Sequence, residues 1–507
     1  MNPGVGPAAV PAARDEGFAG RLVALGLLVL VTRLPLLPTG YGTDTDGWAV
    51  ARAARFIART GGYQASRLPG SPVQEFGSAP VSALGSWGID GLTALMTVAA
   101  AVLLAAILHR LRSRVDVAAA AAFAFVPAVY IASASGMDYL WALAFLLGAV
   151  LSVIGRRHAL AGLLAGLAIG SRITSAVLLL PLALMAFEPG PGALARGARR
   201  TLVMGGLAAL VAGLCFLPVY RVHGAGFLLY YEHAGGHTRG LGYFLGGLFR
   251  LFPLPFSPAL VAGQGTVGVW GLFGCLALVP ALLLALVRAT RPRHARAAPA
   301  LPAMPGRYRA AWALAVVLLV LLYLRLPDDE GYLIPVVPFV LLLLATWLTP
   351  RVFRTLCVTL LLSPFVLGLD ITPPKKGVPP DARSRWVVGF SLGGRERFVL
   401  DPLRGPLLMD LDKRLTAMRI LERVRARWRA LPEGTVVVAG SLVYALLDHL
   451  PARTHALTPV DILAEPEVRA LRAGGAQVLY LPGARERTAR FFGFELDSAG
   501  ARPLLGP

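Results

Sequence analysis

Long apolar runs, separated by short basic or acidic segments, dominate the first 370 residues. Runs of about 20 apolar residues are long enough to cross the hydrocarbon core of a bilayer as helices. The pattern predicts an all-α polytopic membrane protein with about eleven transmembrane helices. The predicted helices lie near residues 20–38, 91–109, 117–135, 139–155, 159–171, 173–187, 201–220, 257–287, 310–326, 331–349 and 352–369.

Residues 159–187 allow two interpretations, because both apolar runs there are short. They form either one long tilted helix or a hairpin that turns at Ser171–Arg172. With a cytoplasmic N-terminus, the hairpin puts the basic loop clusters inside and the acidic residues outside, in line with the positive-inside rule. A single helix would place the basic cluster at 288–309 outside, so the charges favour the hairpin and an external C-terminus.

Composition supports a membrane protein and explains the charge. Hydrophobic residues make up 56% of the chain and charged residues 15%, against about 25% charged residues in a typical soluble protein. Such a chain is neither a soluble globule nor a disordered one. The formal net charge is +21, from 49 Lys and Arg and 28 Asp and Glu. Cytoplasmic loops concentrate such charges, so we expect membrane lipids and no nucleic acid as partners.

The cysteines and histidines predict no metal site. Cys215, Cys275 and Cys357 each lie in an apolar run without zinc-like spacing. We interpret them as small buried side chains. The His-containing segment 232–237 includes Gly235-Gly236, which interrupts the helix that a zinc site of this spacing needs.

The chain changes character after Asp370. Residues 410–431 predict an amphipathic, Arg-rich helix, whereas 435–439 and 477–481 predict buried strands, each followed by a helix. Strand–helix alternation is typical of a small α/β domain, which we expect on the extracytoplasmic side. The predicted domains are a cytoplasmic tail at 1–19, a transmembrane domain at 20–369, a linker at 370–380 and a soluble domain at 381–507.

The first outer loop, residues 39–90, is long for a connection between two helices, and long loops are often functional. Asp44 and Asp46 follow the membrane exit directly. Residues 47–60 put three arginines on one helical face, which is typical of a helix in the membrane interface. Gly61-Gly62 ends this helix.

Two interpretations of Asp44 and Asp46 remain open. They are either solvated carboxylates with a turn or cap role, or a catalytic site at the membrane surface. In a transfer to a hydroxyl acceptor, a carboxylate removes the acceptor proton while a sugar–phosphate bond breaks.

The hairpin at 159–187 carries a stripe of glycines. Gly162, Gly166 and Gly170 are spaced by four residues. This spacing predicts a face for close helix packing rather than a phosphate-binding loop.

Several short motifs follow one another along residues 20–350. They are Arg33 at the end of the first span, Asp44-Thr45-Asp46 before a helix that ends in Gly61-Gly62-Tyr63, Ser66-Arg67-Leu68-Pro69-Gly70-Ser71-Pro72 with Glu75 behind it, the Gly-rich run from Gly162 to Arg172, and Gly331-Tyr332-Leu333-Ile334-Pro335-Val336-Val337-Pro338. In this order and topology, they resemble the GT-C superfamily of membrane glycosyltransferases. The similarity is to bacterial members of the protein O-mannosyltransferase and aminoarabinose transferase type, and residues 381–507 have no part in it.

The resemblance implies a catalytic base in the first outer loop. Asp46 is the best match, because it leads directly into the helix, and Asp44 is the second. Arg67 and Glu75, in the motif that follows, are implied in substrate binding. The Asp-x-Asp spacing would also suit a divalent cation, but two carboxylates alone are a thin ligand set. We therefore expect no resident metal or other cofactor.

Three further residues are candidates for substrate binding. Asp138 lies at an outer turn, Arg172 at the outer end of the hairpin, and Arg239 in the outer loop 221–256. Arginine binds a lipid phosphate with forked donors. The structural alternatives are a helix N-cap for Asp138 and anchoring at the membrane interface for the two arginines.

Resemblance and topology together predict a multi-pass glycosyltransferase of the plasma (inner) membrane. It would move a hexosyl or pentosyl group from a polyprenyl-phosphate carrier to a lipid, glycan or protein acceptor on the extracytoplasmic face, in one inverting displacement. The alternative is a transporter or lipid flippase, which would show internal repeats and ionisable groups near the bilayer midplane. A third interpretation is a non-catalytic scaffold whose outer domain binds a partner.

Overall fold

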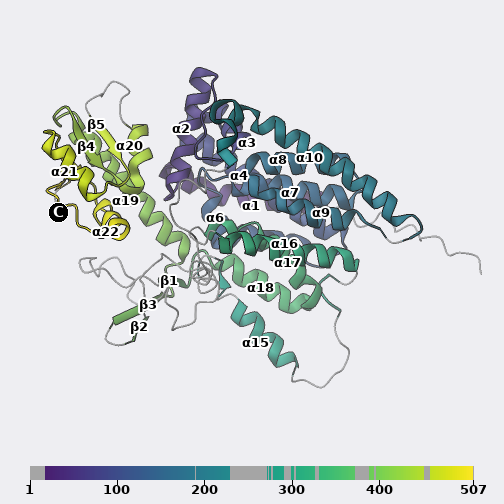
Figure 1. Ribbon diagram of the computed structural model, residues 1–507. Coiled ribbons are helices and arrows are strands. Elements are labelled where there is room, and N and C mark those ends of the chain that lie inside the picture. The colour runs from purple at the N-terminus through teal and green to yellow at the C-terminus, as the bar shows by residue number, and fades with distance from the viewer. Residues whose placement is uncertain are drawn as a thin grey trace, which may run out of the picture.

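The computed structural model describes residues 17–188, 190–228, 271, 273–275, 278–289, 298–301, 304–325, 330–370, 388–392, 395–449 and 457–505. Its helices form an elongated bundle with a smaller part containing strands at one end (Figure 1). In these ranges, five helices are long and apolar enough to cross a membrane, so the chain is an integral membrane protein. These five are Phe18–Thr39, Ser86–Arg110, Ala193–Leu228, Gly306–Arg325 and Glu330–Trp347.

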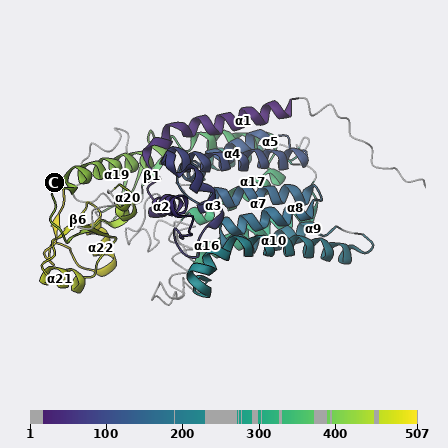
Figure 2. The ribbon, with the colours of Figure 1, turned by 90° about the horizontal axis from the view of Figure 1, so that it is seen from above.

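The helices of the bundle run side by side over much of their length (Figure 2). Within it, α4 packs against α1, α5 and α7, and α8 packs between α7 and α10. The elements are α1 Phe18–Arg33, η2 Leu34–Thr39, α2 Thr45–Thr60, α3 Pro72–Ser78, η3 Ala79–Leu84, α4 Ser86–Arg110, α5 Asp116–Phe125, α6 Pro127–Ala132, α7 Tyr139–Ile154, α8 His158–Ser171, η4 Ile173–Leu178, α9 Leu179–Ala186, α10 Ala193–His223, η5 Gly224–Leu228, α15 Leu278–Ala289, α16 Gly306–Arg325, η7 Glu330–Leu333, α17 Val336–Trp347 and α18 Pro350–Leu362.

The hairpin prediction for residues 159–187 is confirmed. Helix α8 ends at Ser171, Arg172 has an extended backbone conformation, and η4 and α9 follow. The glycine stripe on α8 packs against α10, where a methyl group added to any of the three glycines would overlap atoms of that helix. The α10 residues in contact are Met204, Leu207, Ala208, Val211 and Cys215.

Two predicted spans differ in the structure. The span near 117–135 is split into α5 and α6 at Val126-Pro127, because proline lacks an N–H and its ring clashes with the preceding turn. The span near 352–369 ends at Leu362, and residues 368–370 instead form strand β1. The part of the predicted 257–287 span before residue 271 lies outside the described residues.

The predicted inner loops meet at one end of the bundle. Glu188 lies between three arginines from different segments, with N–O distances of 3.0 Å to Arg156 before α8, 3.1 Å to Arg200 of α10 and 3.9 Å to Arg307 of α16. We call this the Glu188 end. The opposite end, where α7 begins and α8 finishes, is the Asp138 end.

The C-terminal part contains two sheets. The first is antiparallel, in the order β1-β3-β2, and no strand of it was expected from the sequence. The second is parallel, in the order β5-β4-β6-β7, and its strands β4 and β6 confirm the predicted strands at 435–439 and 477–481. The elements are β1 Gly368–Asp370, β2 Val388–Leu392, β3 Arg395–Asp401, α19 Pro406–Trp428, β4 Thr435–Val438, η9 Gly440–Leu442, α20 Val443–His449, β5 Leu457–Val460, α21 Glu465–Ala473, β6 Val478–Tyr480, α22 Ala484–Phe492 and β7 Arg502–Pro503.

Helix α2 matches the predicted helix at 47–60, but it packs against protein where the sequence predicted a helix in the membrane interface. It packs against α20, and its Trp48 belongs to a buried cluster with Leu421 and Leu446 of the C-terminal part. Arg55, one of the three predicted interfacial arginines, donates to Asp448 at 2.8 Å and to the Tyr41 hydroxyl at 2.9 Å. The arginine therefore attaches the first loop to the C-terminal part.

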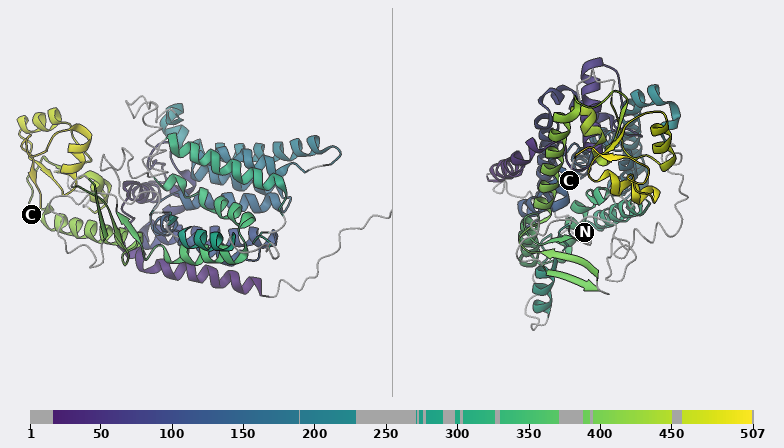
Figure 3. Two further views of the ribbon diagram at one scale, coloured as in Figure 1. Left: turned by 90° about the horizontal axis from the view of Figure 1, so that it is seen from below. Right: turned by 90° about the vertical axis from the view of Figure 1, so that its left-hand side faces the viewer.

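Helix α19 connects the bundle to the parallel sheet (Figure 3). Its Arg414 is 1% exposed and pairs with Asp410 at 2.6 Å. The same guanidinium donates to the backbone carbonyl of Ile131, within α6, and to that of Ala134, just after α6. Asp410 also accepts from Thr43 at 3.0 Å. One buried ion pair thus attaches α19 to two loops of the Asp138 end.

Replacing Arg414 by Met should destabilise the protein strongly. The change leaves Asp410 without its cationic partner and two carbonyls without their donor, and breaking a buried pair costs about 3–5 kcal/mol. Thermal unfolding in detergent measures the loss. Arg419→Met, at an exposed position of the same helix, is the matched control and should change stability by less than about 0.5 kcal/mol. Equal melting of both variants would contradict this attachment.

Candidate active site

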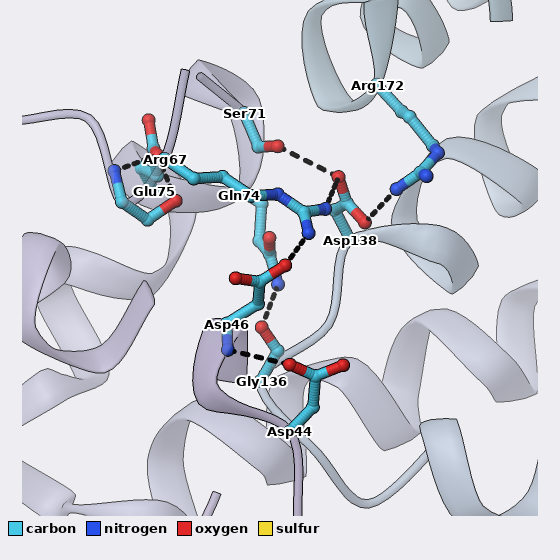
Figure 4. A network of polar contacts seen from close by, with 10 residues as sticks. Asp44, Asp46, Arg67, Ser71, Gln74, Glu75, Gly136, Asp138 and Arg172 are labelled. Atoms are coloured by element: carbon cyan, nitrogen blue, oxygen red, sulfur yellow. Dashed lines mark hydrogen bonds and ion pairs between the residues drawn. The ribbon is translucent and has the colours of Figure 1, made fainter. Parts of the chain in front are cut away.

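Asp138 is the centre of a polar network at the Asp138 end (Figure 4). Its carboxylate is 3% exposed and accepts hydrogen bonds from Arg172 at 2.6 Å, Ser71 at 2.9 Å and Arg67 at 3.2 Å. The residue precedes α7, but its side chain makes no capping hydrogen bond to that helix. Asp138 is thus the N-cap residue of α7 by position, but its carboxylate joins two arginines instead of capping the helix.

Charge compensation keeps Asp138 ionised. Burial raises the pKa of this carboxyl, but the guanidinium groups of Arg172 and Arg67 outweigh it and hold the pKa below its usual range. Asp138 is therefore a carboxylate at neutral pH, and its charge is balanced locally.

Arg172 is buried rather than extended to the membrane surface. Its guanidinium lies 4.2 Å from the ring centre of Tyr139 and 4.4 Å from that of Tyr332, and only 7% of the residue is exposed. Aromatic faces attract a cation in this geometry. The interfacial-anchor interpretation of Arg172 is wrong. The residue also borders a small cavity of about 20 Å³ with Thr174 and Ser175.

The two loop aspartates have different surroundings. Asp44 is the N-cap of α2 and accepts a hydrogen bond from the backbone N–H of Asp46 at 2.9 Å. The carboxylate of Asp46 forms an ion pair with Arg67, and its side chain is 31% exposed. Asp46 is thereby linked through Arg67 to Asp138, so the expected base is part of the same network as the expected phosphate-binding arginine.

Two glycines allow this close approach. The backbone of Gly47, at the start of α2, lies against that of Gly136. A methyl group on Gly136 would overlap Gly47, and one on Gly47 would overlap the backbone carbonyl of Tyr41. Gly136 donates its N–H to Tyr41 at 3.3 Å, and its carbonyl accepts from Gln74 at 3.0 Å. Helix α2 can therefore begin directly beside the turn that carries Asp138.

Glu75 lies in the interior of the first loop. It is fully buried and accepts hydrogen bonds from the Tyr63 hydroxyl at 2.5 Å, the Ser66 N–H at 2.7 Å and the Ser66 hydroxyl at 2.6 Å. Burial raises the pKa of Glu75, and these hydrogen bonds offset part of that effect. In this geometry, Glu75 joins the segment before Arg67 to α3 and so positions Arg67.

A cavity of about 200 Å³ lies beside the network, between the bundle and α19. Asp44 and Tyr139 border it from the bundle, and Asp410 and Lys413 border it from α19. The sequence assigned no site residue to α19, so this wall of the cavity was missed.

The remaining predictions about the site concern Arg239 and metals. Arg239 lies outside the described residues. Within the described ranges, no group of three or more His, Cys, Asp or Glu side chains is placed to hold a metal ion.

None of the protein-family models matches this chain, and no curated protein matches it. Solved structures are similar at low identity. ArnT from Cupriavidus metallidurans bound to undecaprenyl phosphate has a TM-score of 0.42 and 17% identity over 68% of this chain and 60% of ArnT. Its apo form has a TM-score of 0.40 and 14% identity over 68% of this chain and 59% of ArnT.

The Archaeoglobus fulgidus oligosaccharyltransferase, tethered to an acceptor peptide, is also similar, with a TM-score of 0.39 and 12% identity over 88% of this chain and 64% of that one. ArnT, an aminoarabinose transferase, and this oligosaccharyltransferase are both GT-C glycosyltransferases, the superfamily that the sequence motifs resemble. At such TM-scores the similarity assigns no role to a residue.

Replacing Glu75 by Ala should loosen the first loop. The change leaves the Tyr63 hydroxyl and the Ser66 N–H without an acceptor, at a cost of about 1–3 kcal/mol. Glu75→Gln keeps an acceptor oxygen for Ser66 and is the matched control. Limited proteolysis within residues 61–72 should be faster for the Ala variant than for the Gln variant. Equal proteolysis of the two would show that Glu75 does not order the loop.

The contribution of Asp138 should depend on pH. Because its pKa is lowered in the folded state, it stabilises the protein above the unfolded pKa of about 3.9. That stabilisation is lost as the pH falls through the folded value. Asp138→Asn should therefore melt well below the wild type at pH 7, with the difference shrinking below about pH 4. A difference that is constant with pH would mean that the charge of Asp138 is unimportant.

Proposed function

We propose that this chain is an integral membrane glycosyltransferase that moves a sugar from a polyprenyl-phosphate carrier to an acceptor on the extracytoplasmic face. The observation that carries the proposal is the Asp46–Arg67–Asp138–Arg172 network, because it joins a partly exposed carboxylate to two guanidinium groups. A base for the acceptor and cations for the leaving phosphate are the two requirements of this reaction.

Asp46 acts as the base. The acceptor oxygen forms a bond to the anomeric carbon of the donor sugar, and its proton passes to the Asp46 carboxylate. The anomeric carbon–oxygen bond to the phosphate breaks, and its electron pair leaves with the polyprenyl phosphate. The single displacement inverts the configuration at that carbon. Arg67 holds the Asp46 carboxylate in place through their ion pair.

The leaving phosphate is stabilised by arginine. Asp138 uses only Nη1 of Arg172, and no other N–H of that guanidinium has a hydrogen-bond partner in the described part of the chain. A phosphate beside Arg172 would find N–H donors that the two flanking tyrosine rings already hold in position. The polyprenyl tail would remain among the apolar helices.

The network lies at one end of the bundle, so the donor headgroup and the acceptor would meet at a membrane surface. A transporter is expected to place its ionisable groups near the bilayer midplane instead. This location favours the transferase over the transporter or flippase.

Release of free polyprenyl phosphate from a panel of polyprenyl-phosphate sugars, with mixed acceptors, tests the function in nanodiscs. Asp46→Asn should lower the rate by about 10²-fold or more, because it removes the base. Asp412→Asn, a half-exposed aspartate on α19 away from the network, should leave the rate unchanged.

Asp44→Asn tests the assignment of the base. Asparagine caps a helix about as well as aspartate, so this variant should fold normally. A larger loss in Asp44→Asn than in Asp46→Asn would make Asp44 the base. No release from any donor, together with lipid or solute movement across sealed vesicles, would contradict the transferase and support the transporter.

A further inference from the structure

The cavity between the bundle and α19 is a partly open pocket next to the proposed base. It has a volume of about 200 Å³, far above the roughly 10–15 Å³ that is enough to hold one water molecule. Asp44 borders it at the start of α2, two residues before Asp46, and Tyr139 borders it one residue after Asp138. A molecule in the cavity would therefore contact the segments that carry the network.

The charged groups of the wall are mainly acidic. Asp44, Glu330 and Asp410 contribute carboxylates, and Lys413 and Arg414 contribute cations. Arg414 is already committed to Asp410 and to two backbone carbonyls. Lys413, which is exposed, is the cation that remains to meet a ligand. The excess of carboxylates disfavours the binding of an anionic ligand, and these carboxylates can accept hydrogen bonds from hydroxyl or ammonium groups.

The rest of the wall is apolar. Ala128 and Ala132 of α6, together with Met137, Ile334 and Met409, present small or aliphatic side chains to the cavity. Binding sites for small molecules commonly combine an apolar surface with a few polar groups that fix orientation. A sugar ring has this same division, with apolar C–H faces and a hydroxyl-bearing edge.

We infer that this cavity binds the sugar ring of the acceptor, and that the ring is neutral or cationic. The inference rests on the proposed function and narrows the acceptor to a glycan or glycolipid. Asp44 accepts from a ring hydroxyl, Lys413 donates to a ring oxygen, and the two alanines of α6 leave room for the ring. Helix α19 is then part of the substrate site, because it supplies Lys413 and one wall.

Saturation-transfer NMR on the full chain in nanodiscs tests the binding directly, with methyl glucoside, methyl glucosaminide and methyl glucuronide as probes. The neutral and cationic glycosides should bind, and the uronide should bind at least about tenfold more weakly. Ala132→Leu, which fills the cavity, and Lys413→Met should each weaken binding of methyl glucoside by about tenfold. Arg419→Met should have no effect.

Equal binding of all three glycosides, or equal binding by wild type, Ala132→Leu and Lys413→Met, would overturn the inference. Binding of a sugar only when it is attached to polyprenyl phosphate would also overturn it, because the ring would then belong to the donor. The binding readout is independent of turnover. Equal binding of the three glycosides together with normal release of polyprenyl phosphate would therefore contradict this inference alone. Selective glycoside binding without release of polyprenyl phosphate from any donor would contradict the proposed function alone.

Discussion

The buried carboxylate of Asp138 has to be compensated, and the arrangement of the site follows from that requirement. An ionised carboxylate without water is stable only when it is paired and hydrogen-bonded. The partners come from different segments, since Arg67 and Ser71 belong to the first loop and Arg172 follows α8. Moving any of these segments away would leave a charged group of the network without its partner. The position of Asp46 is a consequence, because its partner Arg67 is already held by Asp138.

A second buried pair ties the C-terminal part to the same end of the bundle. Arg414 of α19 binds α6 and the turn after it, Asp410 binds Thr43 next to Asp44, and Arg55 of α2 binds Asp448 of α20. The helix that begins beside the proposed base is thus packed between the bundle and the C-terminal part. This packing explains how a region outside the family resemblance can form a wall of a substrate cavity.

The sequence predicted the features that depend on local patterns. The hairpin, the glycine stripe on α8 and strands β4 and β6 follow from charge, spacing and hydrophobicity, and all are present. It did not predict what depends on contacts between distant segments, such as the pairing of Arg55 with Asp448 in place of a position in the membrane interface. One signal was available. Asp410 and Arg414 occupy the same buried stripe of α19 as Leu421 and Val424, and charges in such a stripe indicate a buried pair.

The central claim is that the Asp46–Arg67–Asp138–Arg172 network is where the sugar is transferred. A cryo-EM structure of the protein in nanodiscs with undecaprenyl phosphate tests it most directly. The account predicts phosphate density in contact with the guanidinium of Arg172 or Arg67, on the side from which Asp46 can reach a bound acceptor. Phosphate density at another place, with no contact to an unchanged network, would contradict the account.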